Sequence, residues 1–191
     1  MPGFGKSFVL DKAYSVGNYC EWLEKFINLS GIESPHIIAH SFGARVAFKY
    51  LSTHPERCSK LIITGGAGMV KPRSPQYMRR VRAYRRVKRI FPRFAERHFG
   101  SEEYRTLSPI MKESYKKIVN EDLQEEVKKI KAPTLLIYGR EDRVTPSDEE
   151  GATFGNLIKN SRLEIMDGGH FCFSEHSDVF NKLIYDFLLE N

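Results

Sequence analysis

The segment Ala39–Ala44, with the sequence AHSFGA, constrains the fold of this chain more than any other feature. A short apolar run precedes it at residues 36–38, and an apolar helical pattern follows it at residues 45–51. Strand, sharp turn, serine and helix, in this order, are the layout of a nucleophile elbow, which holds the serine hydroxyl clear of the sheet. Such a turn needs small residues two positions before and after Ser41, because strand and helix nearly touch there. Alanine and glycine occupy those positions. A serine that caps the helix is the alternative interpretation.

Apolar runs and helical periodicity alternate along most of the chain. The predicted strands are short and apolar, as buried strands are, and lie at residues 36–40, 61–64, 134–138 and 163–166. Helices are expected around them, at residues 19–29, about 45–52, about 147–158 and 179–189. Buried strands that alternate with helices indicate an α/β fold, with a mostly parallel sheet flanked by helices on both faces.

Residues 69–120 interrupt this alternation with a highly charged stretch. Between residues 71 and 97 there are eleven Lys or Arg and one acid, a charge of +10, whereas the rest of the chain has 19 basic and 23 acidic residues, or −4. Apolar side chains recur there at helical spacing, among them Tyr77, Tyr84, Phe91 and Phe94. We interpret residues 69–120 as a helical insertion that covers Ser41, and residues 1–68 and 121–191 as the core.

The charge of this insertion admits several interpretations. The simplest is an outer face in contact with solvent and an apolar inner face turned toward the sheet or the substrate. Attraction to an anionic substrate or to a membrane surface stays open. Nucleic acid is not expected as a partner. The interleaved aromatic residues are compatible with nucleic-acid binding but are not diagnostic of it.

Length and cysteine content narrow the class of protein. A chain of 191 residues fits one domain with a small insertion and buries enough surface to need no disulfide or metal. Neither a run of about 18 apolar residues nor a signal peptide is present, so no membrane span is predicted. The cysteines form no CxxC pair, which predicts free thiols, no zinc site and a reducing, cytoplasmic location; they are Cys20, Cys58 and Cys172.

Serine chemistry requires two further groups, a histidine that accepts the proton and a carboxylate that orients the histidine. In an open α/β sheet these groups belong at the C-terminal ends of strands. Two acids, Glu141 and Asp142, follow the strand at residues 134–138, and His170 comes shortly after the strand at residues 163–166. The chain therefore has the serine–acid–histidine order of a hydrolase triad. An acid in a turn and a histidine at the surface are the alternatives.

Four motifs, taken in order, resemble those of the α/β-hydrolase superfamily, in the group of serine hydrolases with a helical cap. They are the loop Pro2–Ser7, the elbow Ala39–Gly43, the acid loop Gly139–Pro146 and the histidine loop Gly169–Phe171. The elbow departs mildly from the usual pattern, which has glycine where this chain has Ala39. The resemblance selects Asp142 over Glu141 and leaves local structural roles for Asp167 and His40.

The resemblance implies hydrolysis of an ester or related acyl bond in a small-molecule substrate through an acyl-enzyme. Ser41 would attack, His170 would accept and return the proton, and Asp142 would hold the imidazole. The backbone N–H of Phe42 would contribute to the oxyanion hole, and no cofactor and no metal is implied. Esterase, thioesterase, lipase, carbon–carbon bond hydrolase and cofactor-free peroxidase activities stay open. A catalytically silent binding or regulatory domain on the same fold is the alternative from another class.

Family members carry about four strands and a His-Gly loop before the position of Met1, so the resemblance implies a chain that is incomplete at its N-terminus. That loop normally supplies the second oxyanion-hole donor, and its loss is expected to impair activity. The strand at residues 36–40 would then be an edge with exposed hydrogen-bonding groups. We therefore expect that edge to be covered, by self-association or by a missing part of the chain.

Overall fold

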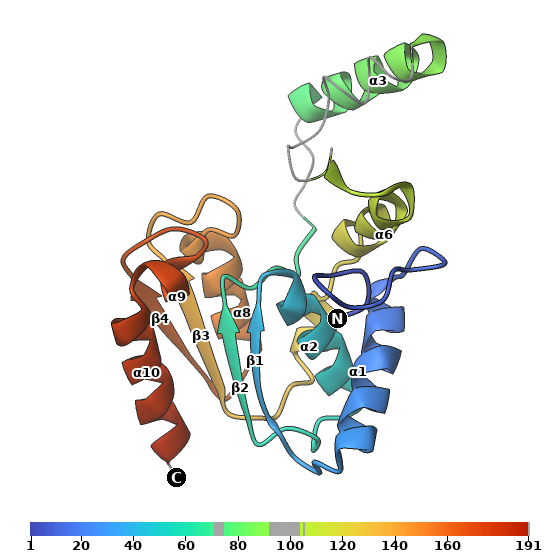
Figure 1. Ribbon diagram of the computed structural model, residues 1–191. Coiled ribbons are helices and arrows are strands. Elements are labelled where there is room, and N and C mark those ends of the chain that lie inside the picture. The colour runs from blue at the N-terminus through green and yellow to red at the C-terminus, as the bar shows by residue number, and fades with distance from the viewer. Residues whose placement is uncertain (71–74, 92–103, 105, 191) are drawn as a thin grey trace.

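The computed structural model describes residues 1–70, 75–91, 104 and 106–190. Its centre is a parallel sheet whose strands are, in spatial order, β1 (His36–His40), β2 (Lys60–Thr64), β3 (Thr134–Gly139) and β4 (Ser161–Met166). Figure 1 shows that the C-terminal ends of these strands all lie at the same end of the sheet. The predicted α/β fold class is confirmed.

Burial decreases from the middle of the sheet to its edges. Every residue of β3 is buried, and so are the last four residues of β2, which explains why both strands read as continuous apolar runs. β1 forms one edge of the described sheet, as expected, and the side chain of Ile38 is 55% exposed there. β4 forms the other edge and carries charged residues, which suit a strand that faces water.

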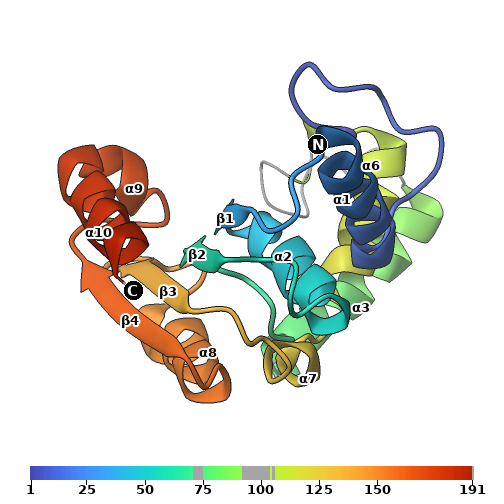
Figure 2. The same ribbon diagram turned by 90° about the horizontal axis from the view of Figure 1, so that it is seen from below.

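Helices cover both faces of the sheet (Figure 2). On one face lie α2 (Phe42–Thr53) and α8 (Ala152–Leu157), whose Phe48 and Phe154 join a core with Ile63 and Leu136. The helix α1 (Val16–Ser30) packs against α2. On the other face α10 (Ser177–Leu189) and the short α9 (Cys172–Glu175) pack Phe180, Phe187 and Cys172 on Ile62, Leu135 and Ile137. Alternate residues of β2 and β3 therefore point into separate cores.

Local signals set the limits of the helices. α1 begins three residues before the predicted start, because the Ser15 side chain accepts the backbone N–H of Asn18 and the Asn18 side chain accepts that of Ser15 in return. It ends at Gly31, whose φ of 68° suits glycine. The helix predicted from residue 147 begins instead with a π-helical turn, η1 (Ser147–Gly151), before α8 continues it.

The insertion contains α3 (Pro75–Ile90) and α6 (Pro109–Val119), and the short α7 (Gln124–Val127) follows it. In Figure 1, α3 lies beyond α6, away from the sheet. Two members of the predicted apolar row, the side chain of Tyr77 and all of Phe94, lie outside the described residues. Among the helices that the structure describes, none combines the length and apolar character needed to cross a membrane.

Both ends of the insertion are held by a buried cation on α2. The guanidinium of Arg45 donates hydrogen bonds to the backbone carbonyls of Met69 (3.2 Å), Ile118 (3.1 Å) and Glu121 (2.6 Å). Arg45 is only 6% exposed, and burial holds its pKa below the ordinary value, although Glu121 and other acids partly oppose this. An ion pair between Lys49 and Glu121 adds a second link one turn along α2.

Candidate active site

Ser41 stands at the junction of β1 and α2 in a strained backbone conformation. Its φ of 50° is the only positive φ of a non-glycine residue in the described part of the chain, and such a conformation costs of order 1–3 kcal/mol. A side-chain atom placed on Gly43 would lie 3.5 Å from the methyl group of Ala39, so strand and helix do approach closely at the two small residues. The Ser41 hydroxyl makes no helix-capping hydrogen bond, which argues against the capping interpretation.

A chain of hydrogen bonds connects the three residues that the sequence singles out. The hydroxyl oxygen of Ser41 lies 2.9 Å from Nε2 of His170, and Nδ1 of His170 lies 2.8 Å from Oδ2 of Asp142. The side chain of His170 is 11% exposed and that of Asp142 is fully buried. With the proton on Nδ1, the imidazole donates to the carboxylate and leaves Nε2 free to accept from the serine hydroxyl.

The acid loop holds Asp142 through several donors. Oδ1 accepts hydrogen bonds from the backbone N–H groups of Val144 (2.8 Å) and Thr145 (3.0 Å). Burial by itself raises the pKa of the Asp142 carboxyl, but the hydrogen bonds from His170, Thr145 and Val144 outweigh burial and hold the pKa below its ordinary value. These donors therefore favour the charged form of a carboxylate whose side chain is fully buried.

Two residues that the sequence analysis did not single out belong to this site. The hydroxyl of Thr145, which is 2% exposed, lies 2.8 Å from Oδ2 of Asp142, 3.0 Å from the carbonyl of Gly65 and 3.3 Å from Nδ1 of His170. A side-chain atom on Gly65 would come within 3.1 Å of His170 and 3.3 Å of Asp142. The available signals were the position of Thr145 within the acid loop and that of Gly65 at the end of a strand.

His40 packs beside the candidate site without joining its hydrogen-bond chain. Its Nδ1 lies 3.0 Å from the Thr64 carbonyl, and its ring lies 4.7 Å from that of His170 and within about 5 Å of Phe171 and Phe173. Burial lowers the pKa of His40, and the neighbouring His170 lowers it further. The position agrees with the local packing role expected for His40.

The first residue of α2, Phe42, carries the N–H expected at the oxyanion hole. Backbone N–H groups in the first turn of a helix lack intrahelical acceptors, so this group is available to an anion. The Phe42 ring packs against Tyr19 and stacks on Phe4, at centroid distances of 5.0 and 5.7 Å. The loop that carries Phe4 therefore lies next to the elbow.

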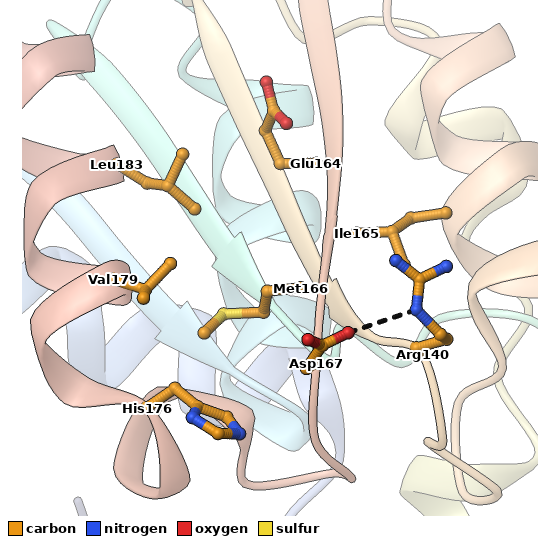
Figure 3. Close-up of a pocket in the computed structure, with 8 residues that line it drawn as sticks. All are labelled: Arg140, Glu164, Ile165, Met166, Asp167, His176, Val179 and Leu183. Atoms are coloured by element: carbon orange, nitrogen blue, oxygen red, sulfur yellow. Dashed lines mark hydrogen bonds and ion pairs between the residues drawn. The ribbon is translucent and has the colours of Figure 1, made fainter.

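The other acids of the two loops lie elsewhere. Glu141 is exposed, and Asp167 forms an exposed ion pair with Arg140, at 3.2 Å. This pair borders a cavity of about 320 Å³ between β4 and α10, shown in Figure 3, which does not include Ser41. The described part of the chain contains no group of three side chains suited to hold a metal.

Comparison with known proteins identifies the family of this chain. A family model described as "alpha/beta hydrolase fold" matches residues 1–129. The chain belongs to the α/β-hydrolase family. Its relatives include a 2-hydroxy-6-oxononadienedioate/2-hydroxy-6-oxononatrienedioate hydrolase of Pseudomonas putida, 27% identical over 87% of this chain and 66% of the relative. A 2-hydroxymuconate semialdehyde hydrolase of the same species is 27% identical over all of this chain and 75% of the relative.

Solved structures of other α/β hydrolases have the same fold. A bromoperoxidase from Bacillus anthracis superposes with a TM-score of 0.78 at 19% identity, over 99% of this chain and 79% of that one. An esterase from Exiguobacterium antarcticum gives 0.76 at 22% identity, over 99% and 79%. A meta-cleavage product hydrolase from Pseudomonas fluorescens gives 0.70 at 22% identity, over 98% and 77%. The chain thus spans 66% to 79% of the length of the proteins named here.

Proposed function

We propose that this α/β hydrolase is a serine hydrolase that cleaves an ester or related acyl bond of a small molecule. The observation that carries the proposal is the hydrogen-bond chain from Ser41 through His170 to Asp142, with donor–acceptor distances of 2.9 and 2.8 Å. These are the residue types, the order and the contacts that nucleophilic catalysis by serine requires.

In the proposed mechanism, Oγ of Ser41 attacks the carbonyl carbon while Nε2 of His170 accepts the hydroxyl proton. The negative charge on the carbonyl oxygen is stabilised by the N–H of Phe42, at the positive end of α2. The intermediate expels the alcohol leaving group, which takes the proton from His170, and leaves Ser41 acylated. Water then attacks the acyl group, giving its proton to His170, and release of the acid returns the proton to Ser41.

Asp142 has an orienting role in this scheme. Its buried carboxylate accepts the Nδ1 proton, which keeps Nε2 directed at Ser41 and stabilises the imidazolium that forms when the hydroxyl proton is transferred. The lowered pKa of Asp142 supports this role, because a carboxylate can stabilise the imidazolium only while it is charged.

Residues 69–120 act in this proposal as a lid over Ser41. Arg45, one helical turn after the serine, binds backbone carbonyls at both ends of the insertion, so the lid and the elbow share one anchor. The substrate would enter between the lid and the C-terminal edge of the sheet, where the hydroxyl of Ser41 lies.

A fluorophosphonate probe, which reacts with activated serines, tests the proposal. We expect labelling of the wild-type chain and its loss in Ser41→Ala. The matched control is Ser30→Ala, a serine at the end of α1 whose hydroxyl donates to the Ile27 carbonyl and which should label like the wild type. A folded wild-type chain that does not label, or a Ser41→Ala variant that still does, would contradict the proposal and favour a silent binding domain.

Carbon–carbon bond hydrolysis is the second candidate, and the names of the Pseudomonas putida relatives favour it. A 6-oxo group would present a ketone carbon to Ser41 in place of an ester carbonyl. Parallel assays of p-nitrophenyl esters and of a 2-hydroxy-6-oxo-dienoate, which loses its absorbance when the conjugated chain is cleaved, distinguish the two candidates.

A further inference from the structure

The helix α3 has a composition that neither the fold nor the proposed mechanism explains. Seven of its sixteen residues are basic and none is acidic; the basic ones are Arg79, Arg80, Arg82, Arg85, Arg86, Lys88 and Arg89. The rest of the chain beyond this stretch is net acidic. A single strongly cationic element on an acidic body indicates a specific anionic partner more than a general need for solubility.

Four arginines of α3 form an exposed row along one side of the helix. At about 100° per residue, Arg79, Arg82, Arg86 and Arg89 fall within an arc of about 80°, and all four are exposed. Val81, Tyr84 and Val87 follow one another at intervals of three residues on the opposite side and are half-buried. The exposed side of the helix is therefore cationic, whereas the opposite side is mixed, because helical periodicity places Arg80 and Lys88 among its apolar residues.

Two exposed apolar residues stand at the end of α3, and Ile90 lies about 20° around the helix from Arg79, beside the arginine row. The backbone N–H of Phe91 donates to the Val87 carbonyl at 2.7 Å, so the helical path extends by one residue. Ile90 is 69% exposed and Phe91 is 63% exposed. Because α3 lies away from the sheet, neither residue belongs to the three described core clusters (Figure 1).

We infer that α3 binds the surface of a bilayer that contains anionic lipids. Such a surface presents phosphate and carboxylate groups to the arginines and an acyl boundary to the exposed Ile90 and Phe91, and so matches the arginine row and these apolar residues at once. Nucleic acid would match the cationic side but would leave Ile90 and Phe91 in water. The inference does not rest on the proposed hydrolase activity.

The test measures binding of the full chain to vesicles by sedimentation. We expect binding to phosphatidylcholine vesicles that contain about 30% phosphatidylserine, and at least tenfold weaker binding to vesicles of phosphatidylcholine alone. Raising the salt concentration to about 0.5 M should weaken the binding strongly, because the Debye length then falls to a few ångströms.

Charge-reversal variants locate the contact. Arg82→Glu with Arg86→Glu should lower vesicle binding at least tenfold, since each basic residue near an anionic surface contributes about a fivefold factor. The matched control is Lys128→Glu with Lys131→Glu, which changes the net charge equally at two exposed lysines outside α3. Circular dichroism and thermal unfolding of every variant establish that a loss of binding is not a loss of folding.

A further variant separates insertion of Ile90 and Phe91 into the bilayer from simple charge attraction. Ile90→Ser with Phe91→Ser leaves every cation in place and should also weaken vesicle binding. The inference is overturned if the wild-type chain does not bind anionic vesicles at low salt. It is equally overturned if the control pair loses as much binding as the α3 pair, if the serine variant binds like the wild type, or if a short DNA duplex is bound and vesicles are not.

Discussion

Replacement of Thr145 by valine is the sharpest test of how the candidate site is organised. Valine keeps the branched shape of threonine and removes only the hydroxyl, which lies 2.8 Å from the Asp142 carboxylate and 3.0 Å from the Gly65 carbonyl. Asp142 would keep its hydrogen bonds from two backbone N–H groups and from His170. Asp142 would therefore lose one hydrogen-bond donor but keep its position beside His170.

The size of the effect follows from the lost hydrogen bond. A hydrogen bond to a charged acceptor contributes about 1.5–3 kcal/mol. At about 1.4 kcal/mol for each factor of ten in rate, kcat/KM for an ester substrate should fall by about tenfold to a hundredfold. The loss should be larger in the transition state than in the ground state, because the charge of Asp142 acts on the imidazolium that forms there.

The assay compares Thr145→Val with Thr145→Ser, which restores the hydroxyl at the cost of one methyl group. We expect the serine variant to recover most of the fluorophosphonate labelling rate and of kcat/KM, although the melting temperatures of both variants fall. If the valine variant labels as fast as the wild type, or if both variants lose labelling only in proportion to stability, Thr145 is structural and the reasoning fails.

Two further predictions concern stability. Arg45→Met should lower the free energy of unfolding by about 2–4 kcal/mol, because three carbonyls, one buried and two part-buried, lose their donor. It should also speed tryptic cleavage of residues 69–120; unchanged cleavage would contradict the anchoring role. His40→Phe should flatten the pH dependence of stability. The pKa of His40 is lowered by burial and by His170, so below about pH 6.5 the unfolded chain binds a proton that the folded chain does not, and stability is lost by up to about 1.4 kcal/mol per pH unit. Urea unfolding of both proteins at about pH 7 and pH 5 tests this, and an equal loss of stability in the wild type and in His40→Phe would refute it.

Local sequence signals predicted most of the fold because they are also the physical causes of its elements. Each strand lies within two residues of its predicted limits. β2 and β3 are buried and are therefore short apolar runs, whereas the two residues missed at the start of the edge strand β4, Ser161 and Arg162, are polar. α2 begins three residues before the predicted helical pattern, because the elbow turn leads directly into the helix and leaves no linker.

The parts that sequence did not predict depend on contacts between distant residues. The role of the Thr145 hydroxyl arises only when β2, β3 and the histidine loop meet. Thr145 and Gly65, for example, are 80 residues apart in the sequence. The anchoring role of Arg45 was not predicted for the same reason. The sequence placed Arg45 only in a helical pattern, and its acceptors lie 24 to 76 residues away. No periodicity or spacing encodes such contacts.

The strand that carries none of the three candidate catalytic residues organises the site through its backbone. At the end of β2, the Thr64 carbonyl accepts the N–H of Ser41 and lies 3.0 Å from Nδ1 of His40, and the next carbonyl, that of Gly65, lies 3.0 Å from the hydroxyl of Thr145. The serine after β1 and the acid loop after β3 are thus both fixed to two consecutive peptide groups, and the N–H of Gly65 in turn donates to Ile137 of β3. Side-chain substitution cannot remove these carbonyls. It can only displace them. Gly65, directly after β2, has a φ of 51° with His170 and Asp142 beside it, so an added methyl group there would disturb both halves of the site together.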